Sequence, residues 1–205
     1  MLKLYYAPGT CALASHIALQ EAGAAYTTER VDFKTNQQNS PEYLAINPKG
    51  RVPALVTDRG ILTETPAMLA FIAQSFPQAK LAPLDDPFEF AQLQAFNSYL
   101  CSTVHVAHAH RPRGYRWATE EASFADMKRK VPETMGAGFA LIERDLRGPW
   151  VMGAAYTICD PYLFTLAQWL EGDGVDLSVL PKVIDHRKRM AQRPAVRQAI
   201  ADELN

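Results

Sequence analysis

Cys11, near the N-terminus, is the first side chain in the sequence that could act as a nucleophile or hold one. Residues 2–6 form an apolar run typical of a buried strand, and the Ala-Pro-Gly sequence at 7–9 ends it. Thr10 is predicted to be the N-cap of the next helix, which places Cys11 in the first helical turn. The helix dipole and free N–H groups there lower a thiol pKa, and could instead hold another molecule's thiolate. The alternative interpretation is that Cys11 is a small buried residue without a chemical role.

A proline at the start of the third predicted strand gives a second candidate binding feature. Pro53 has no backbone N–H, so it belongs at a bend or a sheet edge, and we expect a cis peptide bond between Val52 and Pro53. The N–H and C=O of Val52 would then be unpaired and would face the helix that carries Cys11. A bound peptide could pair with Val52 as an added strand.

The sequence Thr-Glu-Thr-Pro at 63–66 gives a third feature, the start of another helix, with Thr65 as its predicted N-cap. The amides of this helix start and the Thr65 hydroxyl suit a carboxylate, and Glu64 beside them suits an ammonium group. A carboxylate and an ammonium on one carbon describe an α-amino acid. With a thiol near Cys11 and a backbone pair at Val52, the ligand described is γ-glutamyl-cysteinyl-glycine.

The elements that must position these residues divide the chain into two parts. Strand and helix patterns alternate over the first part in the order β-α-β-α-β-β-α, which predicts an α/β unit whose first two strands are parallel. Prolines and an aspartate pair between 77 and 87 mark a linker, assigned to 80–86. Beyond it the apolar residues recur at helical spacing. We therefore predict an α/β domain at 1–79 and an all-helical domain at 87–205.

Three local predictions accompany this division. Val31 and Phe33 should point inward at the end of the second strand. Pro132 should kink or split a long helix. Thr157 and Asp160 form a capping box, with Asp in place of the usual Glu, at the start of an almost wholly apolar helix.

Composition limits the classes of function. The 205 residues include 21 Lys and Arg against 22 Asp and Glu, so binding to nucleic acid through bulk positive charge is not expected. The three cysteines are widely spaced and predict no disulfide framework. The sequence contains no apolar run long enough for a membrane span and no signal-peptide pattern, so we expect a cytoplasmic protein.

Across nearly its whole length the sequence resembles the glutathione S-transferases, most closely the bacterial beta class. The segments that carry this resemblance are residues 3–11, 46–53, 62–65, 104–105, 157–164 and 191–194. The resemblance implies a thioredoxin-like domain followed by an all-helical domain, and a homodimer.

The resemblance also implies roles for individual residues. Cys11 and His105 would line the active site as catalytic residues, with Cys11 in contact with the glutathione sulfur. The chain has Asn36 and Ser98 where other members can have Lys and Asn, and Val106 follows the histidine in place of Lys. The residues expected to bind glutathione are Tyr6, Thr10, Cys11, Asn36, Arg51, Val52, Pro53, Glu64, Thr65, Ser98 and His105.

Two polar clusters in the helical part have alternative interpretations. His105, His108 and His110 lack a nearby acidic partner in sequence, so no metal site is predicted, and a solvated helix end is favoured for His108 and His110. The arginines at 111, 113 and 116, with Tyr115 and Trp117, either attract anionic or aromatic substrates or form a solvated helix end or a dimer contact.

The predicted function is the transfer of glutathione, as co-substrate and without a cofactor, to small apolar electrophiles. Thiol–disulfide exchange through Cys11 is a second prediction, limited to a monothiol route because Ala14 replaces the second cysteine of a C-x-x-C motif. The non-enzymatic alternative is a protein of the same fold that binds glutathione or apolar ligands, or serves as a scaffold.

Overall fold

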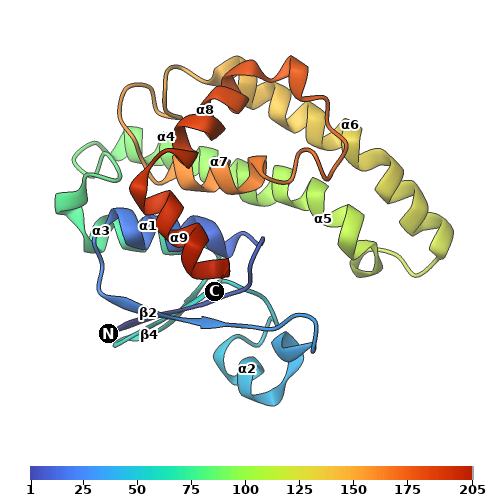
Figure 1. Cartoon of the computed structure of the whole chain (residues 1–205), viewed down its shortest axis with the longest axis horizontal. Coiled ribbons are helices and arrows are strands. Elements are labelled where there is room, and N and C mark those ends of the chain that lie inside the picture. Colours follow the sequence, from blue (N-terminus) through green and yellow to red (C-terminus); the bar gives the residue numbers. More distant parts are fainter. Residues whose placement is uncertain (205) are drawn as a thin grey trace.

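The computed structural model describes residues 1–204 and contains a four-stranded sheet followed by a helical part (Figure 1). The elements of the first part are β1 (Leu2–Tyr6), α1 (Ala12–Glu21), β2 (Tyr26–Arg30), α2 (Pro41–Ile46), β3 (Ala54–Thr57), β4 (Gly60–Thr63) and α3 (Thr65–Ser75). Those of the second are α4 (Pro87–Tyr99), α5 (His105–Arg113), α6 (Glu121–Asp145), α7 (Cys159–Ala167), α8 (Pro181–Ala191) and α9 (Pro194–Leu204).

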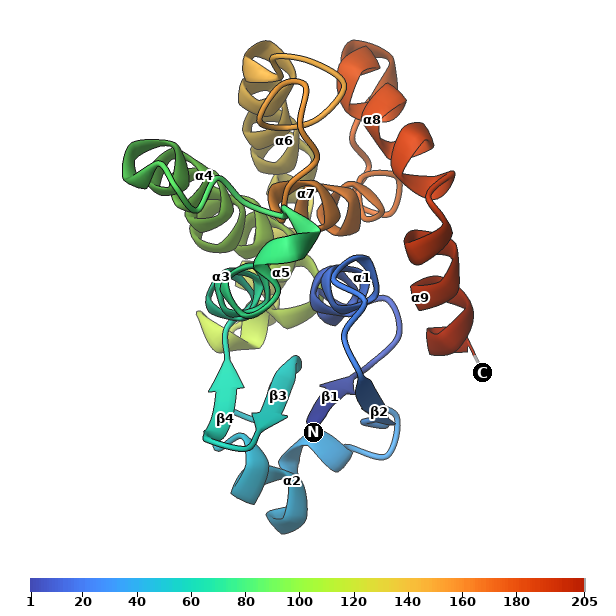
Figure 2. The ribbon, with the colours of Figure 1, turned by 90° about the vertical axis from the view of Figure 1, so that its left-hand side faces the viewer.

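The sheet has the strand order β2-β1-β3-β4. β1 and β2 are parallel, as predicted from the helix between them, and β3 pairs antiparallel with both β1 and β4. Helices α1 and α3 cover one face and α2 the other (Figure 2). Alternate β1 residues serve the two faces, since Leu4 belongs to the main core and Tyr5 packs against Tyr43 of α2.

The helical part is built around α7, every residue of which is buried. Its capping box forms as predicted, because the Asp160 carboxylate accepts a 2.7 Å hydrogen bond from the Thr157 N–H. Asp160 also accepts from the Val151 N–H at 2.8 Å and lies 2.9 Å from His186 Nε2. This buried carboxylate therefore connects α7, the preceding loop and α8.

The C-terminal helix α9 returns to the first part and packs on α1 (Figure 2). The guanidinium of Arg193 forms a two-pronged ion pair with Glu21, and buried His16 pairs with Glu203. The two parts are thus held together by α1, which contacts both α7 and α9.

The prediction that Phe33 points inward was wrong. Phe33 is 38% exposed rather than inward, because β2 ends at Arg30 and only Val31 continues into the core. Pro132 does not split α6, which runs as one helix from Glu121 to Asp145. None of the helices within residues 1–204 is both long enough and apolar enough to cross a membrane.

Candidate active site

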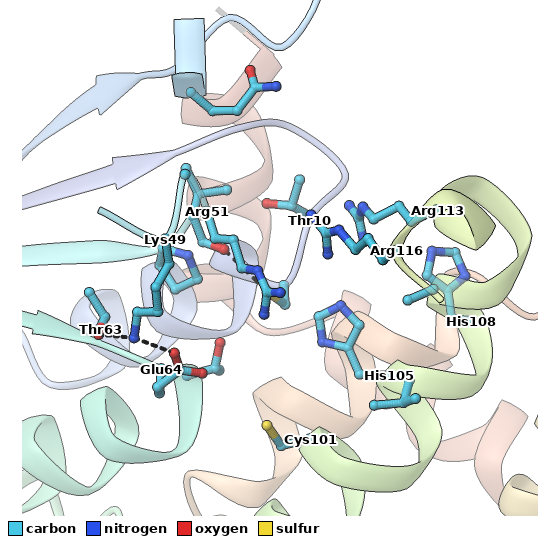
Figure 3. Close-up of a pocket in the computed structure, with 18 of the residues that line it drawn as sticks. Thr10, Lys49, Arg51, Thr63, Glu64, Cys101, His105, His108, Arg113 and Arg116 are labelled. Atoms are coloured by element: carbon cyan, nitrogen blue, oxygen red, sulfur yellow. Dashed lines mark hydrogen bonds and ion pairs between the residues drawn. The ribbon is translucent and has the colours of Figure 1, made fainter. Parts of the chain in front are cut away.

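A cavity of about 580 Å³ lies between the start of α1, the turns flanking β3 and β4, and helix α5 (Figure 3). Of the residues predicted to bind glutathione, it is lined by Thr10, Cys11, Arg51, Val52, Pro53, Glu64, Thr65 and His105. Residues from both parts of the chain therefore form one site.

Cys11 occupies the N-cap position of α1, one residue later than the predicted cap Thr10. Thr10 still supports the turn, because its hydroxyl donates to the Ala7 carbonyl at 2.7 Å and accepts from the Ala12 N–H at 3.3 Å. The Cys11 thiol donates to the Val52 carbonyl, with a sulfur–oxygen distance of 3.6 Å. This contact joins the start of α1 to the turn before β3.

The predicted lowering of the Cys11 pKa was wrong. Burial raises the pKa of this thiol to about 11 and outweighs the opposing effects of the Thr65 hydroxyl and the Arg113 guanidinium. Cys11 is therefore a neutral thiol at pH 7. In that state it is a hydrogen-bond donor that can face a thiolate supplied by a ligand.

The Val52–Pro53 peptide bond is cis, as predicted. The carbonyl of the preceding Arg51 is fixed by two donors, the Tyr43 hydroxyl at 2.7 Å and the Asn47 side-chain amide at 2.6 Å. The Val52 N–H makes no hydrogen bond with residues 1–204. The Val52 carbonyl is not unpaired as predicted, because it accepts from the Cys11 thiol. An extended peptide in the cavity can therefore pair with the free Val52 N–H and share the carbonyl with Cys11.

The start of α3 forms the opposite end of the cavity. Helix α3 begins at buried Thr65, and Glu64 before it has a left-handed φ of 72°, so the N-cap lies one residue earlier than predicted. The Glu64 carboxylate pairs with the Lys49 ammonium, which also donates to the Thr63 hydroxyl at 2.7 Å (Figure 3). This arrangement offers an acceptor for an ammonium next to helix amides for a carboxylate.

His105 enters the cavity from the helical part, at the first residue of α5. A π-helical turn at Leu100–Val104 separates α4 from α5, and both Cys101 within it and His105 after it line the cavity. Burial, followed by the field of Arg113, lowers the pKa of His105 to about 4. His105 is therefore neutral at pH 7 and acts as a hydrogen-bonding group, not as a cation.

Three residues expected to bind glutathione lie away from the cavity. The Tyr6 hydroxyl donates to the Asp202 carbonyl of α9 at 3.3 Å, because this strand residue faces the C-terminal helix. Asn36 is exposed and its side-chain oxygen accepts from Asn39 at 2.6 Å. Ser98 lies exposed on α4, before the π turn that places Cys101 at the cavity.

Sequence reasoning missed several residues that line the cavity. Lys49 reaches it from the turn before Gly50, and Phe33, expected in the core, lies at its wall. The distant Trp169 lines it too and donates from its indole N–H to the Gly9 carbonyl at 3.1 Å. Further missed lining residues include Gln38, Asn39, Cys101 and Tyr162, whereas Arg113 and Arg116 belong to the arginine cluster for which a substrate contact was one of the two alternatives.

His108 is not the solvated residue that was predicted. Its Nδ1 lies 2.7 Å from the carboxylate of buried Asp173, and its ring stacks on Trp169 with centroids 4.1 Å apart. His110 stacks on Trp117 at 4.3 Å. Both histidines therefore help to fix aromatic side chains beside the cavity.

The fold and the site together define a class of protein. In this class a cis-proline and a cysteine at a helix start, both in a thioredoxin-like domain, face a cavity that a helical domain closes. A family model for the glutathione S-transferase N-terminal domain matches residues 1–74. Glutathione S-transferase GstA of Escherichia coli O157:H7 is 33% identical over 206 residues, covering 98% of each chain.

Solved structures give the same result. A glutathione transferase homologue from Sulfitobacter, solved with bound glutathione, has a TM-score of 0.96 and 48% identity, covering 100% of this chain and 99% of that one. The beta-class glutathione S-transferase of Sphingomonas chungbukensis has a TM-score of 0.85 and 35% identity, with 98% of each chain covered. The chain belongs to the glutathione S-transferase family, and its resemblance to the bacterial beta class is confirmed.

Proposed function

We propose that the protein transfers glutathione to a small electrophile. The observation that carries this proposal is the convergence of the Cys11 thiol, the Val52 backbone and the Glu64–Thr65 helix start on one cavity. The γ-glutamyl head binds at Glu64 and Thr65, the cysteinyl backbone pairs with Val52, and the glutathione sulfur lies beside Cys11. The membership of the glutathione S-transferase family supports this pose.

Binding is expected to involve an exchange of partners at Glu64. Its carboxylate is paired with Lys49 in the ligand-free protein, so the incoming ammonium group of glutathione replaces Lys49 there. The released Lys49 ammonium is then available to the glycyl carboxylate. Lys49 thereby supplies the cation that other family members can have at position 36, where this chain has Asn36.

The chemical step is attack by the glutathione thiolate on the electrophilic carbon. A thiol with a pKa near 8.5 is about 3% ionised at pH 7, and lowering that pKa by two units makes roughly three-quarters of it ionised. The neutral Cys11 thiol and the Thr10 hydroxyl are the nearest candidate donors to the thiolate, with His105 across the cavity. A carbon–sulfur bond forms, the leaving group departs with its electron pair, and the thiol proton passes to solvent.

Thiol–disulfide exchange through Cys11 is a second candidate, favoured by the position of its sulfur in the glutathione cavity. The Cys11 thiolate would attack the glutathione sulfur of a mixed disulfide between glutathione and a small thiol, and that thiol would leave. A glutathione thiolate would then attack the same sulfur, releasing the Cys11 thiolate and oxidised glutathione. The raised pKa of Cys11 slows the first of these steps.

The organisation proposed for the active protein follows the predicted domains. Residues 1–79 bind glutathione, residues 87–205 hold the electrophile, and residues 80–86 link them. The protein acts as a homodimer in the cytoplasm and uses no cofactor. Light scattering on the purified protein tests the dimer, since a monomer mass would contradict it.

Conjugation of chlorodinitrobenzene tests the proposed function, with glutathione affinity measured by calorimetry in parallel. Saturable conjugation by the wild type, with intact mass unchanged after exposure to oxidised glutathione, supports transfer as the main activity. A glutathione adduct that forms on the wild type but not on Cys11→Ala would show that thiol–disulfide exchange occurs as a second activity. Tight glutathione binding without conjugation of any electrophile would instead support the non-catalytic alternative.

A further inference from the structure

The cavity carries more positive charge than its own side chains balance. Four permanent cations line it, and Glu64 is the one carboxylate in its lining within residues 1–204. Glu64 is paired with Lys49, which leaves three arginines. The guanidinium groups of Arg51, Arg113 and Arg116 make no ion pair and no hydrogen bond with residues 1–204. They point into the cavity from two sides (Figure 3).

Arg113 is the most informative of the three, because it is partly buried and still unpaired. Arg111, two residues earlier on α5, has its guanidinium on the buried carboxylate of Asp173. Arg113 has no such partner, and burial lowers the pKa of its guanidinium. A partly buried cation without a counter-ion is unfavourable. The contrast between two neighbouring arginines indicates that the counter-ion of Arg113 comes from a ligand.

Glutathione alone does not neutralise this site. As the thiolate it carries three negative charges and one positive charge, a net charge of two negative. The four cations and the Glu64 carboxylate give the cavity lining an excess of three positive charges when His105 is neutral. One positive charge therefore remains for a second ligand.

The remaining charge lies beside aromatic surface. Arg113 ends α5 and Arg116 follows within one turn, so both are on the side opposite the glutathione-binding turns. Tyr115 and Trp117 line the same side, with 65% and 46% of their surfaces exposed, and Trp117 is held by its stack on His110. A planar ring can lie on these side chains while an attached anion reaches the arginines.

We propose that the second substrate is an electrophile that carries a carboxylate on a planar conjugated ring, and that Arg113 and Arg116 bind this carboxylate. The inference rests on the proposed glutathione transfer and narrows its substrate class from a purely apolar electrophile to an anionic one. With an aryl chloride, the glutathione sulfur forms the bond to the ring carbon, the carbon–chlorine bond breaks, and chloride leaves with the electron pair.

A matched pair of substrates tests the proposal. Chloronitrobenzoate and chloronitrobenzamide have the same ring and leaving group but differ in charge. We expect kcat/KM for the benzoate to exceed that for the benzamide by about tenfold or more, as a charge-assisted contact predicts. Arg113→Gln and Arg116→Gln should each remove most of this preference, with little change for the benzamide or in the KM for glutathione. Arg147→Gln, which removes an exposed arginine outside the cavity, should keep the preference.

Two results would overturn the assignment. Equal rate enhancements for both substrates in the wild type, each measured against the uncatalysed reaction with glutathione, would mean that no anion is selected. A rise in the KM for glutathione in the arginine variants, with either substrate, would mean that these arginines bind a glutathione carboxylate.

A binding measurement separates this inference from the proposed function. If neither substrate is conjugated, glutathione transfer to this class fails. Calorimetry with unreactive nitrobenzoate and nitrobenzamide, in the presence of S-methylglutathione, still tests the anion subsite. Tighter binding of nitrobenzoate that is lost in Arg113→Gln supports the subsite, and equal binding of the two compounds overturns it.

Discussion

The indole N–H of Trp169 donates a 3.1 Å hydrogen bond to the carbonyl of Gly9, which ties the helical part to the turn that carries Cys11. The ring is held from its other side by His108, which stacks on it and pairs with buried Asp173. A chain of contacts therefore runs from the interior of the helical part to the candidate glutathione site. The hydrogen bond from Trp169 to Gly9 helps to fix the position of the start of α1.

Replacing Trp169 by Phe tests this link. The phenyl ring keeps most of the stacking surface but loses the bond to Gly9, which is worth about 1 kcal/mol. We expect glutathione affinity to fall several-fold and the melting temperature to change little. Calorimetric titration and thermal melts measure the two effects. Unchanged affinity would show that the turn is positioned without this bond.

Gly50 is predicted to be essential for the turn before β3. Its φ is 59°, and an added Cβ would lie 2.9 Å from the Asn39 side-chain oxygen and 3.2 Å from the Gln38 carbonyl. Gly50→Ala should lower the free energy of unfolding by more than the roughly 1–2 kcal/mol of left-handed strain alone, and should weaken glutathione binding.

Gly23 provides a matched control for this substitution. Its φ of 63° is similar, but nothing lies within 4 Å of an added Cβ. Gly23→Ala should therefore show the strain without the clash and leave glutathione binding intact. Urea unfolding of both variants measures the difference, and equal destabilisation would contradict the predicted contact with residues 38 and 39.

The Cys11 thiol should be unreactive in the ligand-free protein. Its pKa of about 11, against the ordinary 9.0, makes the thiolate fraction at neutral pH about a hundredfold smaller. Alkylation of Cys11 by iodoacetamide, followed by peptide mass spectrometry, should be slower than that of free cysteine by about this factor. If Cys11 were alkylated as fast as free cysteine or faster, the pKa of its thiol would not be raised. The result would then agree with the lowered pKa predicted from the position of Cys11 at a helix start.

Much of the site could be predicted from sequence because it depends on local signals. The strand–turn–helix pattern places Cys11 at a helix start, and Pro53 and the Thr-Glu-Thr-Pro sequence mark two further turns at the same sheet. The direction of the Cys11 pKa could not be predicted, because it depends on how completely the fold excludes water from the thiol. The sequence located the start of this helix to within one residue, but it did not predict the burial around the Cys11 thiol.

Most of the residues that the helical part contributes to the cavity could not be predicted from the sequence. Trp169 is far from Cys11 in the chain, and its sequence surroundings do not differ from those of an ordinary helix end. The arginine cluster that contains Arg113 was recognised, but a solvated helix end or a dimer contact remained an alternative for it. Asn36 and Ser98 were expected to bind glutathione only from the family resemblance, and they lie off the cavity, while Lys49, which lines it, was not predicted. Only the packing of α5 and α7 against the first part reveals these positions.

His105 should make stability depend on pH. The unfolded chain protonates this residue near the ordinary pKa of 6.5, and the folded protein only near 4. Between these values the unfolded state binds more protons, so the free energy of unfolding falls as pH decreases, by up to about 1.4 kcal/mol per unit. His105→Gln should remove this contribution. Urea unfolding across this pH range measures it, and equal slopes for variant and wild type would contradict the prediction.

The most direct test of the central claim is the titration of the thiol of bound glutathione, followed by thiolate absorbance in the wild type and in Cys11→Ala. If the site stabilises the thiolate, the pKa of bound glutathione should lie about two units below the unperturbed value near 8.5, and less in the variant. A bound thiol that titrates at its free-solution pKa in both proteins would contradict the account.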